Sequence, residues 1–86
     1  MASPLKVGVI SDTHGLVREE ALDTLRGVDV IVHAGDVGGS HVLQELGELA
    51  PVIAVRGNVD LEPWARALPE RRRLDLGGAP VLLLHD

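Results

Sequence analysis

Blocks of apolar and polar positions alternate along the chain in an order typical of strands followed by helices. Short apolar, β-branched runs occupy residues 5–10, 29–33 and 52–55, as in strands that are buried on both faces of a sheet. Apolar residues at helical spacing follow the first two runs and predict helices over 17–25 and 41–49, the second capped by Ser40. A short third helix is expected at 63–68, where Pro63 suits a first turn.

The last part of the chain predicts a β-hairpin. A run with one polar face covers residues 71–76, and the glycine-containing segment 77–80 separates it from the apolar residues 81–84. Strands that alternate with helices favour a parallel sheet with right-handed crossovers, and we expect the hairpin to add one antiparallel strand to it. The predicted fold is therefore α/β, with a mainly parallel sheet, flanking helices and a C-terminal β-hairpin.

Composition and charge narrow the class of protein. The 86 residues allow one small domain, and 45% of them are apolar, enough for a core of Val, Leu, Ile and Ala. A net charge of −5 argues against broad binding to nucleic acid or to anionic membranes. The absence of Cys excludes a disulfide scaffold and a thiol nucleophile. Because no apolar run is long enough for a membrane span or a signal peptide, we expect a cytoplasmic protein.

Residues of the metal-ligand type follow four of the five predicted strands. Such side chains gather at one edge, because ligands of open α/β sheets bind beyond the carboxyl ends of the strands. Oxygen donors mixed with imidazole suit Mn, Fe, Zn or Mg. Each loop alone is also explained by ordinary capping and turn residues, but four loops with a ligand at the same edge favour a metal site. The residues concerned are Asp12, His14, Asp36, Asn58, Asp60, His85 and Asp86.

The same segments resemble the successive motifs of calcineurin-like metallophosphoesterases. The likeness is greatest to small bacterial and archaeal phosphodiesterases whose Asn-containing motif lacks a following His. It implies half of the β-sandwich of that family, and we expect residues 1–86 to be the N-terminal part of a single domain that ends before the final Gly-His-x-His motif. The matching segments are Ser11-Asp12-Thr13-His14-Gly15, His33-Ala34-Gly35-Asp36, Gly57-Asn58-Val59-Asp60 and Leu84-His85.

The resemblance implies a role for each matching residue. Asp12 and His14 would bind a first metal ion, and Asp36 would bridge it to a second. Asn58 and His85 would bind the second ion, with the Asn58 amide also near a phosphate oxygen. The family implies two divalent ions, with Mn favoured and Fe, Zn, Ni or Mg as alternatives, and a hydroxide between them that attacks phosphorus.

Other positions near these motifs bear on catalysis and packing. Val59 stands where many relatives have the His that protonates the leaving group, which favours good leaving groups or diesters. Asp60 is a candidate to assist catalysis in its place. Arg56, beside Asn58, is a candidate contact for the substrate phosphate. His33, at the end of the second predicted strand, is expected in the core or behind the ligands.

The function predicted from these residues is that of a metal-dependent phosphoesterase, a phosphodiesterase acting on a small phosphodiester. A homo-oligomer stays open as its assembly, and no membrane partner is expected. The alternative is a non-catalytic, protein-binding scaffold, as in the retromer subunit that resembles these phosphodiesterases, or an inactive fragment. The presence of Asp12, His14, Asp36, Asn58 and His85 in this chain favours an enzyme.

Overall fold

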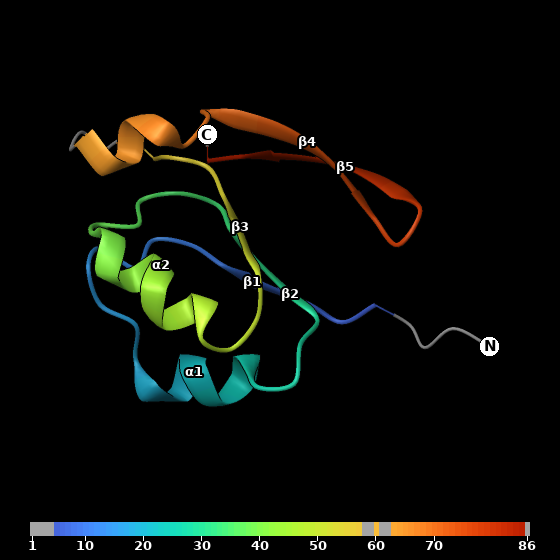
Figure 1. Ribbon diagram of the computed structural model, residues 1–86, viewed down its shortest axis with the longest axis horizontal. Helices are drawn as coiled ribbons and strands as arrows, with labels where there is room; N and C mark the ends of the chain where they lie inside the picture. The colour runs from blue at the N-terminus through green and yellow to red at the C-terminus, as the bar shows by residue number, and fades with distance from the viewer. Residues whose placement is uncertain (1–4, 58–59, 61–62, 86) are drawn as a thin grey trace.

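The computed structural model describes residues 5–57, 60 and 63–85. The predicted order of strands and helices is confirmed, and within the described ranges no helix has the length and apolar character needed to cross a membrane (Figure 1). The elements are β1 (Val7–Ile10), α1 (Glu19–Leu25), β2 (Val30–His33), α2 (Ser40–Gly47), β3 (Val52–Ala54), the 3₁₀ helix η1 (Pro63–Ala67), β4 (Arg71–Leu76) and β5 (Ala79–Leu84).

The first three strands form a parallel sheet in the order β1-β2-β3. Their β-branched side chains suit a sheet that is covered on both faces. The register pairs Ile10 with His33, and His33 with Ala54, so the three strands end in one row. The loops that follow β1, β2 and β3 therefore leave the sheet side by side.

The hairpin is a separate two-stranded sheet in the part of the chain that the structure describes. β4 and β5 pair antiparallel from Arg71 opposite Leu84 to Leu76 opposite Ala79, around a turn in which Gly77 and Gly78 both have positive φ. The expectation of one mixed sheet is therefore wrong. The hairpin buries its apolar face flat against the parallel sheet, and this contact replaces pairing along an edge.

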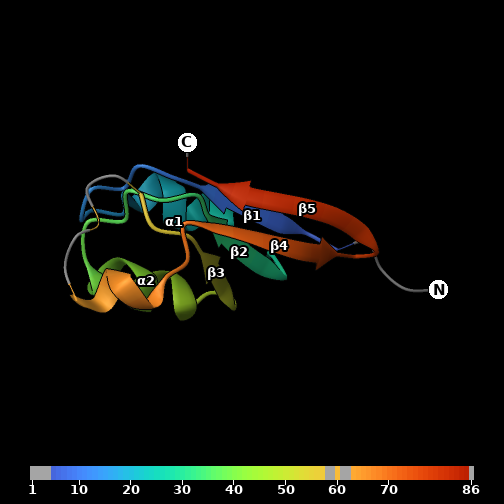
Figure 2. The same cartoon turned by 90° about the horizontal axis from the view of Figure 1, so that it is seen from above.

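The helices and the hairpin cover opposite faces of the parallel sheet, as Figures 1 and 2 show. Neighbouring residues of β2 pack on opposite faces of the sheet, because successive side chains of a strand point to opposite faces. Ile31 packs in a cluster with Leu25 of α1 and Leu46 of α2. Val32 packs on the other side with Val55 and with Leu83 of the hairpin. The chain thus has two thin cores, one on each face of the sheet.

The start of α2 differs from the predicted capping. Ser40 is the first residue of the helix, and Gly39 takes the capping position without a side-chain hydrogen bond. A Cβ on Gly39 would lie 2.5 Å from the ring of His41, so a larger capping residue requires the exposed His41 side chain to move. The His41 ring is exposed and donates through Nε2 to the Gly15 carbonyl at 2.6 Å.

Candidate metal centre

The loops after β1 and β2 are joined to each other by backbone hydrogen bonds. The N–H groups of Asp12, His14 and Gly15 donate to the carbonyls of Gly35, Asp36 and Val37 at 3.0, 3.0 and 2.8 Å. These bonds continue the β1–β2 pairing beyond the end of the sheet. They place the side chains of Asp12, His14 and Asp36 next to one another, as their positions after the strands predicted.

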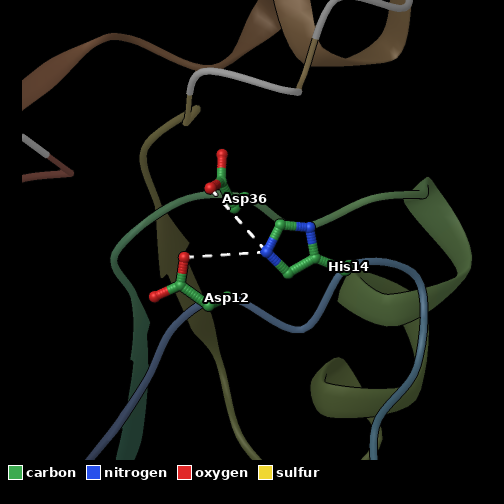
Figure 3. Close-up of side chains that lie close together, drawn as sticks. All are labelled: Asp12, His14 and Asp36. Carbon is green, nitrogen blue, oxygen red and sulfur yellow. Dashed lines mark ion pairs between the residues drawn. The ribbon is translucent and has the colours of Figure 1, made fainter.

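Asp12, His14 and Asp36 form a group with metal-binding geometry (Figure 3). His14 Nε2 lies 3.8 Å from Asp12 Oδ1 and 3.9 Å from Asp36 Oδ2, and one ligand atom from each residue lies within 4.8 Å of the others. These separations are too long for hydrogen bonds. They match donors that share one cation at bond lengths of about 2.0–2.2 Å. Two carboxylates and an imidazole are also the donor chemistry that divalent Mn, Fe or Zn accepts.

The backbone of these residues is strained. Asp12, His14 and Asp36, with φ of 56°, 48° and 56°, are the non-glycine residues with positive φ in the described ranges. Few non-glycine residues adopt this conformation, and its cost is typically met where a side chain must be aimed at a functional site. The strain falls on the three residues of the metal-binding group, which is an indication of function independent of their chemistry.

His85 reaches the same group from the end of the hairpin. Its Nδ1–H donates to the Ala34 carbonyl at 2.8 Å, and its Nε2 lies 3.1 Å from Asp36 Oδ2. Asp36 Oδ2 is therefore approached by the imidazole Nε2 atoms of both His14 and His85. The Asp36 carboxylate is thus contacted from the loop after β1 and from the end of the hairpin.

His33 lies behind the metal-binding group, and the expected core position is confirmed, since its side chain is fully buried. Its Nδ1 accepts from the Gly35 N–H at 3.1 Å, and Thr13 Oγ1 lies 3.0 Å from Nε2 while donating to the Val37 carbonyl at 2.7 Å. This network assigns the proton of a neutral ring to Nε2. Burial lowers the pKa of His33, although the carboxylates of Asp60, Asp12 and Asp36 oppose that shift. Thr13, missed in the sequence, links the first two loops through this ring.

Asp60 is buried, with 3% of its surface exposed, and its carboxylate accepts three backbone hydrogen bonds. Burial alone raises the pKa of this carboxyl, but hydrogen bonds from the Gly57, Gly38 and Val37 N–H groups outweigh it, so the pKa lies below its ordinary value. This setting does not fit the expected part in catalysis. A carboxylate that is ionised, enclosed and fully engaged has no proton to give to a leaving group.

The remaining expected site residues are placed only in part. Asn58 and Asp86 lie outside the described residues. Gly57, which precedes Asn58, passes so close to Asp36 that an added Cβ would lie 2.1 Å from Asp36 Oδ1. Arg56 donates from Nη2 to Glu70 Oε1 at 3.0 Å, and its contact with a substrate phosphate stays a prediction.

Comparison with known proteins identifies the family of this chain. The sequence matches the calcineurin-like phosphoesterase superfamily domain over residues 5–86, and the chain belongs to this family. It is 38% identical over 84 residues to a protein of Methanothermobacter thermautotrophicus named as a probable metallophosphoesterase, covering 92% of this chain and 48% of that protein. A protein of the same name from Methanocaldococcus jannaschii is 33% identical over 90 residues, with 99% and 45% covered. The chain thus spans about half the length of these curated relatives.

Solved structures share the fold. Vps29 from Entamoeba histolytica, in a single-mutant form, superposes with a TM-score of 0.78 at 24% identity, covering 93% of this chain and 47% of that one. Vps29 from Chaetomium thermophilum superposes with a TM-score of 0.76 at 19% identity, covering 91% and 43%. At these identities the likeness shows the fold alone.

Proposed function

We propose that this chain carries the metal-binding part of a phosphoesterase that hydrolyses small phosphodiesters with two divalent ions, Mn²⁺ being the first choice. The observation that carries the proposal is the position of Asp36. Its Oδ2 atom is approached by the imidazole Nε2 atoms of His14 and His85, within a group of strained residues that includes Asp12. Membership of the phosphoesterase family supports the same type of chemistry.

In this proposal each ligand has one role. Asp12 and His14 would hold the first ion, Asp36 would be shared by both ions, and His85 would hold the second. Asn58 joins the second site on the strength of its motif. When bound, the ions would activate a bridging water as hydroxide and offset the charge that develops on phosphorus.

The chain's own residues determine where the ions and the substrate are held. The Ala34 carbonyl orients the His85 ring, because it accepts the Nδ1 proton and leaves Nε2 facing Asp36. Asn58 and Arg56 are the proposed contacts for the substrate phosphate. With Val59 in place of a proton-donating His, diesters with good leaving groups are the proposed substrates.

The test is Mn²⁺-dependent hydrolysis of bis-p-nitrophenyl phosphate by the 86-residue chain, compared with Asp36→Asn. We expect the substitution to lower turnover by about 10²–10³-fold, the loss typical when one preorganised electrostatic contact is removed. Asp75→Asn is the matched control, because Asp75 is an exposed residue near the end of β4 and accepts from Gly78 N–H at 2.8 Å. Wild-type turnover in Asp36→Asn would show that Asp36 does not bridge the ions.

The second candidate function is a non-catalytic scaffold on the same fold. The chain spans about half the length of its curated relatives, and it shares its fold with Vps29 from two organisms. The same assay separates the candidates. Tight Mn²⁺ binding without turnover, in a folded chain, would favour the scaffold or a requirement for the other half of the domain.

A further inference from the structure

We propose that Asp60 is a positioning residue for the metal centre, because its carboxylate ties the loop that carries Asp36 to the loop that follows β3. This inference rests on the proposed metal site for its effect on metal binding, while its geometric part stands on the contacts of Asp60 alone. The sequence suggested that Asp60, which lies close after Asn58, assists catalysis. The positioning role takes the place of that expectation.

The carboxylate of Asp60 uses both oxygen atoms. Oδ1 accepts from Gly38 N–H at 3.0 Å, and Oδ2 accepts from Val37 N–H at 3.0 Å and from Gly57 N–H at 2.8 Å. Val37 and Gly38 directly follow Asp36, and Gly57 comes from the neighbouring loop. One oxygen atom is thus shared by two loops, which sets the distance between them.

Backbone pairing holds the first two loops together but does not extend to the third. Three backbone hydrogen bonds link residues 12–15 to residues 35–37. Between the loops after β2 and β3, the last backbone-to-backbone hydrogen bond among the described residues is Val55 N–H to the His33 carbonyl, at the end of the sheet. Beyond that point, the Asp60 carboxylate takes the place of the missing pairing.

The hydrogen bonds of Asp60 join the two loops where their backbones are already in close contact. A Cβ added to Gly35 would lie 2.9 Å from the backbone nitrogen of Gly57, and a Cβ added to Gly57 would lie 2.2 Å from the backbone nitrogen of Asp36. A charged acceptor makes shorter and stronger hydrogen bonds to backbone N–H groups than a neutral one. Asp60 therefore fixes the closest approach of the two loops on each side of Asp36, and with it the place of the proposed bridging carboxylate.

The test compares Asp60→Asn with the wild-type chain and with Asp75→Asn, which removes a carboxylate that also accepts a backbone N–H but is exposed, near the end of β4. Amide hydrogen exchange is measured by NMR in metal-free protein at Val37, Gly38 and Gly57. Mn²⁺ affinity is measured by calorimetry on the same samples. We expect exchange at the three amides to rise at least tenfold in Asp60→Asn only, and its Mn²⁺ affinity to fall by about 10–100-fold.

Amide exchange and Mn²⁺ affinity test different parts of the proposal. A general loss of stability leaves the dissociation constant of the folded molecules unchanged, so wild-type affinity in folded Asp60→Asn overturns the positioning role. Unchanged exchange at the three amides overturns the tie itself, whether or not the chain binds metal. If the wild-type chain binds no Mn²⁺, the proposed function fails while the exchange data still decide the tie.

If Asp60→Asn does not fold, Asp60→Glu gives the same test. Glu keeps the charge and places the carboxylate one methylene further from the backbone, so the three hydrogen bonds cannot all form at their present lengths. We expect faster exchange at the three amides and weaker Mn²⁺ binding in this variant too. Wild-type values of both quantities in Asp60→Glu overturn the proposal.

Discussion

Replacing Gly57 by Ala tests how closely the site depends on the contact between the loop after β3 and Asp36. A Cβ at this position would lie 2.1 Å from Asp36 Oδ1 and 2.2 Å from the Asp36 backbone nitrogen, whereas ordinary contacts lie at 3.4–4 Å. The side chain of Asp36 alone cannot relieve the overlap, because one of the two atoms belongs to the backbone. One of the loops therefore has to move by about 1 Å.

The size of the effect follows from that movement. Forcing an additional methyl group into a packed region costs about 1–3 kcal/mol of unfolding free energy. A misplacement of about 1 Å at a catalytic site lowers the rate by about 10²-fold, well beyond what the loss of stability explains. We therefore expect Gly57→Ala to remain folded, to bind Mn²⁺ more weakly and to lose about two orders of magnitude in metal-dependent turnover.

Gly47→Ala is the matched control for this experiment. Gly47 is the last residue of α2, and a Cβ there would meet nothing within 4 Å, so the same chemical change is expected to stabilise the helix by about 0.5–1 kcal/mol. Urea unfolding gives the stability of both variants, and calorimetry and hydrolysis of bis-p-nitrophenyl phosphate give their metal binding and turnover. Wild-type affinity and turnover in Gly57→Ala would refute the view that this contact sets the geometry of the site.

Two further predictions concern pH and metal removal. Because burial lowers the pKa of His33 in the folded chain, the unfolded chain binds a proton first as the pH falls below about 6.5. The free energy of unfolding should then decrease by up to about 1.4 kcal/mol per pH unit. Urea unfolding of His33→Gln should not show this decrease. Mn²⁺ at 100 times its dissociation constant should stabilise the folded chain by about 2.7 kcal/mol, measured by thermal melting. A chelator should reverse this stabilisation, and Asp36→Asn should not show it. An equal shift in Asp36→Asn would contradict the assigned ligand.

The sequence predicts well those features that depend on local pattern. The β-branched runs predict the parallel strands, and the row formed by Ile10, His33 and Ala54 places the following loops side by side. That is why Asp12 and Asp36, far apart along the chain, meet as expected. Parallel pairing converts a position in the sequence into a position in space with little further information.

Features that depend on long-range contacts are not predictable in this way. Asp60 has the residue type of a catalytic group, and only its contacts with Val37 and Gly57 identify it as a buried acceptor. Ser40 is a typical capping residue, yet the helix begins one residue earlier than the predicted cap allows. The prediction of one mixed sheet is wrong for a similar reason. The local pattern of a hairpin does not show whether it pairs with the edge of the parallel sheet or packs on its face.

The placement of the hairpin connects the second core to the metal centre. Because β5 packs through Leu83 against Val32 and Val55, the chain after it arrives over the carboxyl edge of the parallel sheet. There the His85 ring lies so close to the backbone that a Cβ on Gly35 would be 2.8 Å from the His85 Cβ. An edge-paired hairpin would have no such constraint on His85. The contacts that close the core on one face of the sheet thus also bring His85 to Asp36, so the packing of the hairpin and the geometry of the proposed second metal site are determined together.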